Sequence, residues 1–211
     1  MALQDVVRRL LPRSEHLYEF LERQASATRA AGASLSRFAD RAPLDDILTE
    51  LRAQEDLSHT ALHELEDALR SNFVTPIDRD DLQHLASELH RVVVLIASSG
   101  GHCQMFGLSE PTAPMIELLG ILAHCTAQLD EMVPALHRHD YPALMSTSRA
   151  LRKETKRARV VSRSGLSSLF HGTKDAKSIL REMRIVEHLD HAIDRCDRVA
   201  HRLANVAVKH G

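Results

Sequence analysis

Apolar residues recur along most of this 211-residue chain at intervals of three and four, which places them on one face of an α-helix. No segment shows the strict alternation of apolar and polar residues that is typical of a half-buried strand. The pattern predicts six helices, at about residues 14–38, 44–71, 76–98, 113–137, 141–170 and 174–208.

Prolines and capping residues mark the expected helix starts. The first helix is expected to begin after Pro12, and Pro43 stands in the first turn of the second. Thr75 is the expected N-cap of the third helix, with Pro76 in its first turn and the acid Asp78 completing a pattern like a capping box.

Three positions predict interruptions. Ser98 to Gly101 reads Ser-Ser-Gly-Gly and predicts the main break, Pro134 a kink or end of the fourth helix, and Gly172 a turn. Helices near 30 residues long favour an elongated antiparallel all-α bundle. Six helices also suggest a pseudo-repeat of two three-helix units, at about residues 1–98 and 111–211.

Composition narrows the possible functions. The chain has 27 basic and 29 acidic residues and only 3% aromatic residues, so its charge does not indicate a nucleic-acid-binding protein. We find neither an apolar run of 18 residues nor a signal-peptide pattern, and we therefore expect a soluble cytoplasmic protein.

Catalytic motifs are not recognisable in this sequence. Cys103, Cys125 and Cys196 form no CxxC pair and are expected to be mostly buried, inert thiols. His102 is adjacent to Cys103 in sequence, but a catalytic base must be held within hydrogen-bond reach of its nucleophile, and nothing indicates that here. We expect that the protein is not an enzyme.

The last helix carries a ladder of acidic and imidazole side chains. Its members are spaced 3, 4, 3 and 4 residues apart and share one face beside the apolar strip: Glu187, Asp190, Asp194, Asp197 and His201. Neighbouring carboxylates repel each other, so the ladder requires cations. These could be a metal ion or arginines, of which the same helix offers Arg195, Arg198 and Arg202.

Two other helices offer ligands at i,i+4 spacing. The second helix carries Glu55, His59 and His63, and the third carries Asp80, His84 and Glu88, with His90 nearby. If two such strips pack against each other, mixed oxygen and nitrogen ligands would suit iron, manganese, nickel or zinc better than calcium. Each strip alone is also what an ordinary solvated helix face looks like.

The fifth helix has a basic strip. Five of its cations lie near one face: Arg149, Arg152, Lys153, Lys156 and Arg163. The strip is either a solvated face that balances acidic neighbours, or a docking surface for phosphate, an acidic partner or anionic lipid. No aromatic residues interleave it, which argues against nucleic acid.

Two segments resemble a known family. Phe73 to Leu82 reads FVTPIDRDDL and resembles the F-x-T-P-(I/F)-D-R-(E/D)-D-I signature of PhoU-like proteins that accompany Pit-type phosphate permeases. Leu189 to Asp197 reads LDHAIDRCD and is similar to that family's closing L-E-x-x-x-D-R-C-E pattern. Val208-Lys209 matches its end, and the first helix agrees in style, so the resemblance covers essentially the whole chain.

The resemblance implies a single all-α domain built from two three-helix PhoU units, regulation of phosphate uptake, and E/D-x-x-x-D motifs that can hold metal. Asp190 and Asp194 fit such a motif, and Glu55 fits another in which His59 replaces the second acid. The acids expected in the third helix are missing from residues 89–94. In the fifth helix Thr155 and Arg159 stand near the expected acids, although Glu154 could stand in for one, and Arg159 could replace a metal's charge.

The leading hypothesis is a non-enzymatic regulator of inorganic phosphate transport that docks to a permease or signalling partner at the inner membrane face. Homo-oligomers are also allowed. The metal ligands expected first are Glu55, His59, Asp190 and Asp194, and the further candidates are His63, His90, Glu187 and Asp197. One alternative is a metal-storage or metal-dependent bundle enzyme, which requires Glu-x-x-His motifs directed into the core. The other is a structural adaptor whose acids are neutralised by arginines.

Overall fold

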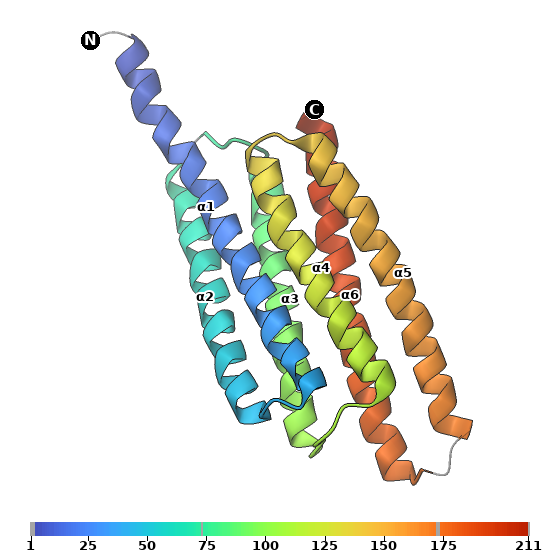
Figure 1. Ribbon diagram of the computed structural model, residues 1–211. Coiled ribbons are helices and arrows are strands. Elements are labelled where there is room, and N and C mark those ends of the chain that lie inside the picture. Colours follow the sequence, from blue (N-terminus) through green and yellow to red (C-terminus); the bar gives the residue numbers. More distant parts are fainter. Residues whose placement is uncertain (1–2, 73, 172–173, 211) are drawn as a thin grey trace.

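The computed structural model describes residues 3–72, 74–171 and 174–210, with side chains described from His16 onward. Over these ranges the protein is a bundle of six long helices with no strand (Figure 1), which confirms the predicted all-α class. The helices are α1 (Leu3–Ser36), α2 (Leu44–Ser71), α3 (Arg79–Met105), α4 (Ala113–His137), α5 (Tyr141–His171) and α6 (Ala176–His210), and a short 3₁₀ helix, η1 (Arg37–Asp40), follows α1.

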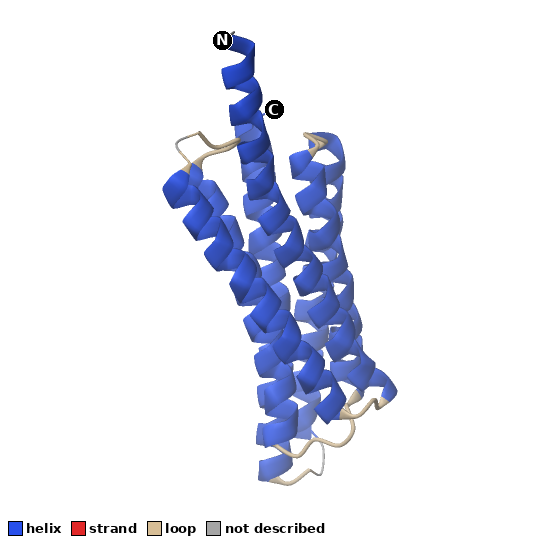
Figure 2. Cartoon of the chain, turned by 90° about the vertical axis from the view of Figure 1, so that its left-hand side faces the viewer, coloured by secondary structure: helices blue, strands red, loops and turns tan. Residues whose placement is uncertain are grey.

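Four helices form the centre of the bundle and two lie outside it. α1, α3, α6 and α4 pack in a ring, α2 packs against α1 and α3, and α5 packs against α4 and α6 (Figures 1 and 2). Every contact within α1–α3 has a counterpart within α4–α6. Such symmetry is what a duplicated three-helix unit would produce, and the duplication stays a prediction. None of the described helices is both long and apolar enough to cross a membrane.

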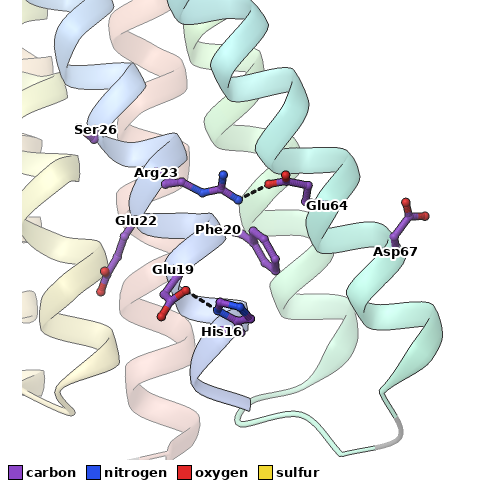
Figure 3. Close-up of a pocket in the computed structure, with 8 residues that line it drawn as sticks. All are labelled: His16, Glu19, Phe20, Glu22, Arg23, Ser26, Glu64 and Asp67. Carbon is purple, nitrogen blue, oxygen red and sulfur yellow. Dashed lines mark hydrogen bonds and ion pairs between the residues drawn. The ribbon is translucent and has the colours of Figure 1, made fainter. Parts of the chain in front are cut away.

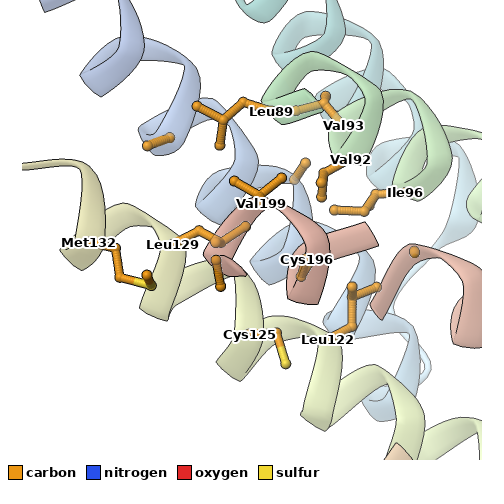
Figure 4. Packing of buried hydrophobic residues seen from close by; sticks show 14 of the residues in the cluster. Leu89, Val92, Val93, Ile96, Leu122, Cys125, Leu129, Met132, Cys196 and Val199 are labelled. Carbon is orange, nitrogen blue, oxygen red and sulfur yellow. The ribbon is translucent and has the colours of Figure 1, made fainter. Parts of the chain in front are cut away.

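One continuous apolar core runs between the helices. Leu89, Val92 and Ile96 of α3 pack with Leu122 and Leu129 of α4 and with Cys196 and Val199 of α6 (Figure 4). Cys103, Cys125 and Cys196 are all buried, as expected. Burial raises the pKa of Cys103 and of Cys125 to about 12. Because the thiolate is the nucleophilic form, these thiols are poorly suited to catalysis.

A buried glutamine ties the first three helices together. The Nε2 atom of Gln24 in α1 donates to the carbonyl oxygens of Ser58 in α2, at 3.2 Å, and Ala86 in α3, at 3.1 Å. Because an amide excluded from water is costly unless it is paired, these bonds favour one register of the three helices.

Several predicted boundaries are confirmed and others are corrected. α2 and α4 begin and end where predicted, and α4 ends three residues after Pro134. α1 begins at Leu3 and continues through Pro12, because a proline removes one helical hydrogen bond without obliging the helix to end. Phe73 and Gly172, named in the sequence analysis, lie outside the described residues.

The start of α3 also differs from the prediction. The N-cap is Asp78, whose carboxylate accepts from the backbone N–H of Asp80 at 2.9 Å, rather than Thr75. An ionised acid satisfies a free N–H and interacts favourably with the helix dipole, so the last residue of the Thr-Pro-Ile-Asp segment makes the cap. At the corresponding end of α6, Asp175 accepts from the N–H groups of Lys177 and Ser178.

The predicted break at Ser98 to Gly101 is wrong, because α3 continues through it to Met105. Gly100 is buried, and a Cβ atom there would lie 2.9 Å from Leu51 Cδ1 and 3.1 Å from Leu48 Cδ2 of α2. The glycine therefore permits close helix packing rather than a turn. The real connection between α3 and α4 comes later, where Gly107 has a φ of 64° that favours glycine.

Candidate functional site

The acidic ladder of α6 lies beside α5, and arginines bind its central carboxylate. Asp194 accepts from Arg159 Nη2 of α5 at 2.8 Å and from Arg198 Nε, one turn along α6, at 3.2 Å. Burial by itself would raise the pKa of Asp194, but these hydrogen bonds and charges outweigh it and lower the pKa. Asp194 is therefore ionised at neutral pH and held by two guanidinium groups.

The neighbouring acids share the field of the same arginine. Asp190 and Asp197 have no hydrogen bond or ion pair within the described residues. The pKa of Arg159 is raised, first by its hydrogen bond to Asp194 and further by Asp197 and Asp190. Burial raises the pKa of Asp190, and Asp194 adds to the effect. Arg159 thus supplies the cation that the ladder requires.

The two ends of the ladder are separate from this centre. Glu187 pairs with Arg184 within α6 at 3.5 Å, and His201 is exposed. Arg195 does not neutralise the ladder, because its Nη1 atom binds Glu88 of α3 at 2.9 Å. Of the three arginines that α6 offered, only Arg198 has an ion pair with the ladder in the described structure.

The basic strip of α5 lies on the exposed side of that helix. Its five members are exposed and have no ion pair among the described residues: Arg149, Arg152, Lys153, Lys156 and Arg163. In contrast, Arg157 binds Glu117 of α4 at 2.7 Å and Arg159 binds Asp194. The two cations at the edges of the strip therefore serve the fold, while the five central ones are available to another molecule.

Histidines cluster on the other side of the molecule, between α2 and α3. The Nε2 atoms of His59 and His63 are 3.0 Å apart, and the ring centroids of His59 and His90 are 5.6 Å apart. His90 also lies 3.2 Å from the hydroxyl of Ser58. Burial, followed by the charges of His59 and His63, lowers the pKa of His90. The three rings are thus close together on one face of the α2–α3 pair.

The predicted ligands of a shared metal site do not converge. Glu55 and His59 lie on α2, Asp190 and Asp194 lie on α6, and these two helices make no contact in the described structure. α2 packs against α1 and α3, which separate it from α6. In the described ranges no group of three or more His, Cys, Asp or Glu side chains is arranged to hold a metal ion. Asp80 and His84 are exposed on α3, away from the ladder.

A hollow of about 960 Å³ between α1 and α2 contains none of the predicted site residues. Figure 3 shows Arg23 directed at Glu64 across the hollow and His16 directed at Glu19. Arg23 also lies 5.0 Å from the ring of Phe20. Arg23 and His16 are thus each paired with a neighbouring carboxylate, and the hollow offers no evident chemistry.

The sequence analysis missed one pair of stacked histidines between the two halves. The rings of His102 in α3 and His188 in α6 have centroids 4.0 Å apart, and neither ring nitrogen of His188 has a hydrogen-bond partner. Burial, and then the charge of His102, lowers the pKa of His188. No local pattern reveals this pair, because the two residues are 86 positions apart in the sequence.

The fold and these faces define a class of protein: an elongated six-helix bundle with an apolar core and charged outer helices, whose acidic ladder is neutralised from within. Comparisons with known proteins agree with this description. A solved PhoU-like protein from Shewanella oneidensis MR-1 superposes with a TM-score of 0.75 at 14% identity, over 92% of this chain and 99% of that one. A second structure from that bacterium, described as a "putative PhoU-like phosphate regulatory protein", gives a TM-score of 0.72 at 14% identity, over 92% and 99% of the chains.

Sequence comparison gives two weak relatives of similar length, and no family model matches the chain. The chain is 20% identical to the "Putative pit accessory protein" of Rhizobium meliloti (strain 1021), over 96% of this chain and 97% of that protein. It is 19% identical to UPF0111 protein YkaA of Bacillus subtilis (strain 168), over 82% and 84%. The resemblance to PhoU-like proteins is thereby confirmed, and the fold is PhoU-like.

Proposed function

We propose that this protein is a non-enzymatic accessory protein of inorganic phosphate transport, which docks to a permease at the cytoplasmic face of the membrane. The similarity to a protein named as a Pit accessory protein extends over nearly the whole of both chains, and the fold is that of PhoU-like proteins. The names of these relatives suggest phosphate transport as the process, and the charged faces of this chain suggest a means of docking.

The observation that carries the proposal is the basic strip of α5. Its five cations are exposed without a carboxylate partner in the described structure, on an outer helix whose opposite side is buried. Unpaired surface cations at helical spacing attract acidic protein segments and anionic headgroups, and they accelerate association. The cytoplasmic leaflet around a permease carries anionic headgroups, and we assign the strip to docking at that face.

The direct test is co-purification with a Pit-type phosphate permease. We expect the wild-type protein to bind, and charge reversal of the strip (Arg149→Glu, Lys153→Glu and Lys156→Glu together) to weaken binding at least about tenfold, with a strong dependence on salt. The matched control reverses three exposed cations elsewhere (Arg52→Glu, Arg91→Glu and Arg138→Glu) and should bind like the wild type. Failure of the wild-type protein to bind, or equal losses in both variants, would contradict the proposal.

A second function, metal binding, is favoured by one observation on α2. His59 and His63 are one turn apart with Nε2 atoms 3.0 Å from each other, a separation at which two imidazoles can share one divalent transition metal. Glu55, one turn earlier on the same helix, is half-buried, and we propose it as an oxygen ligand beside the pair. We propose this pair, rather than the arginine-bound ladder, as the site for zinc, nickel, iron or manganese.

Metal analysis of the protein purified without a histidine tag tests this second function. We expect up to one transition metal per chain and a higher melting temperature on addition of zinc or nickel. The variant His59→Ala should lose both effects, while His84→Ala, which removes an exposed histidine from the neighbouring helix, should keep them. Absence of both effects in the wild type would overturn the metal proposal and leave the docking proposal standing.

A further inference from the structure

A polar groove runs along α6 on the side between α3 and α5. It has a volume of about 540 Å³. The α6 side chains that line it include four cations at helical spacing: Arg195, Arg198, Arg202 and Lys209. α5 contributes Arg152, and α3 contributes Asp81 and Glu88. Because three helices border it, the groove is a hollow in the surface rather than a single exposed helix face.

Three of the cations are held in place by carboxylates. Arg195 binds Glu88 at 2.9 Å, Lys209 binds Asp81 at 2.7 Å, and Arg198 binds Asp194 at 3.2 Å. The first two pairs join α6 to α3. Side chains fixed in this way lose less conformational entropy when they bind a ligand than free ones do, so the groove is partly preorganised.

The two remaining arginines have no such partner. Arg152 and Arg202 line the groove, and their side chains make no hydrogen bond or ion pair with any described residue. Arg202 is half-buried, where an unpaired charge is less well solvated than on an open surface. The lining thus contains five cations and three carboxylates, Asp81, Glu88 and Asp197, while Asp194, just outside the lining, pairs with Arg198.

We propose that this groove binds a phosphate group of a small soluble molecule, with inorganic phosphate as the simplest ligand, through Arg152 and Arg202. A guanidinium group presents paired N–H donors that match phosphate oxygens. The two guanidinium groups without a carboxylate partner, Arg152 and Arg202, offset the charge of a phosphate dianion. The three carboxylates along the lining repel a long polyanion, and the hollow shape suits a small ligand better than a membrane surface.

This phosphate site rests on the proposed function and deepens it, because it gives a transport accessory protein a ligand of the kind that the permease carries. Arg152 belongs both to the groove and to the basic strip of α5, so a bound phosphate places a negative charge at one edge of the docking strip. Phosphate occupancy and permease binding then compete for Arg152, and phosphate should weaken docking. The binding itself requires no permease and is tested without it.

Isothermal titration calorimetry with sodium phosphate at neutral pH, with ionic strength matched by sodium chloride, tests the groove directly. We expect saturable binding to the full-length wild-type protein and a loss of roughly tenfold or more in the variant Arg152→Gln with Arg202→Gln. Neither arginine has a carboxylate partner in the described structure, so this variant should fold normally, as circular dichroism and the melting temperature will show. The control Arg91→Gln with Arg138→Gln removes the same charge from exposed sites outside the groove and should bind phosphate like the wild type.

Three results would overturn the inference. The first is no saturable heat in the wild type beyond that of the chloride blank. The second is an equal loss in the groove variant and the control, which would indicate unspecific attraction. The third is binding only to vesicles of phosphatidylcholine and phosphatidylglycerol, with no binding of free phosphate, which would assign the cations to a membrane surface. Each is distinguishable from failure of the permease proposal, because no permease is present.

Discussion

The outer helices α2 and α5 occupy equivalent places in the two halves of the bundle, yet the charged faces that they form with α3 and α6 differ in chemistry. On the α5–α6 face a fixed guanidinium, Arg159, neutralises the acid Asp194. On the α2–α3 face three imidazoles, His59, His63 and His90, lie together. The hydrogen bonds that lower the pKa of Asp194 keep this carboxylate ionised in its pair, whereas imidazoles can take up a proton or bind a cation near neutral pH. One face of the fold is therefore built on a fixed ion pair, and the other is a responsive face.

The largest expected effect comes from disturbing the packing between α2 and α3. Gly100→Ala forces a methyl group against Leu51 and Leu48 of α2, so we expect a loss of about 1–3 kcal/mol in unfolding free energy. The neighbouring Gly101 has no atom within 4 Å of the position that its Cβ would occupy. Gly101→Ala should therefore stabilise α3 by up to about 1 kcal/mol. Urea denaturation of both variants checks this opposition, and equal effects would contradict the close approach of α2 and α3.

The cap of α3 gives the next effect. Asp78→Ala removes the carboxylate that accepts from the N–H of Asp80 and should cost about 1 kcal/mol. Thr75→Ala, at the residue that the sequence suggested as the cap, should change the unfolding free energy by less than about 0.5 kcal/mol. If the two variants reversed this order in thermal denaturation, α3 would begin at Thr75 after all.

These two sites show which parts of the structure local sequence can predict. Periodicity identified all six helices, and the limits of α2 and α4 were predicted correctly, because one-sided burial leaves a regular apolar pattern. The Ser98 to Gly101 segment misled because glycine is favoured both in turns and where helices approach closely, and only tertiary contact distinguishes the two. Thr75 misled because two acceptable capping residues lie three positions apart.

The residues of the candidate site could be predicted from the sequence, but the pairs that they form between helices could not. The ladder, the histidines and the basic strip follow from i,i+3 and i,i+4 spacing within single helices. Which strips meet is decided by helix order in the bundle, and that order places α5 rather than α2 beside α6. Arg159 was recognised as a possible replacement for a metal's charge, whereas the pairing of Arg195 with Glu88 across α3 and α6 could not be derived from either helix alone.

Removing the fixed cation should make the α5–α6 face resemble its counterpart. Arg159→Ala deletes a largely exposed ion pair with Asp194 and should cost about 0.5–1 kcal/mol, more at low salt than at high salt. The control Arg149→Ala removes a cation with no partner among the described residues and should be nearly neutral. In the Arg159→Ala variant, millimolar Mn²⁺ should raise the melting temperature more than in the wild type, because Asp194 then keeps only Arg198 and the nearby acids Asp190 and Asp197 lose the charge of Arg159. Identical responses to Mn²⁺ would show that Arg159 does not occupy the place of a metal.

The smallest expected effect is a difference between the two faces in how they make the unfolding free energy depend on pH. Because burial and the nearby His59 and His63 lower the pKa of His90 in the folded protein, the unfolded chain takes up a proton first as the pH falls below about 6.5. Unfolding free energy should therefore decrease as the pH falls through this range, with a slope of less than one proton for this residue. His188 contributes with the same sign, so His90→Gln should reduce the slope without abolishing it.

Asp194, whose pKa is lowered, contributes only near and below the ordinary aspartate range, and Asp194→Asn should leave the slope above pH ~5 unchanged. Chemical denaturation of the wild type, His90→Gln and Asp194→Asn between about pH 5 and 7 measures the slope of unfolding free energy against pH. A slope that depends on Asp194 and not on His90 would show that the responsive face had been assigned to the wrong half of the bundle.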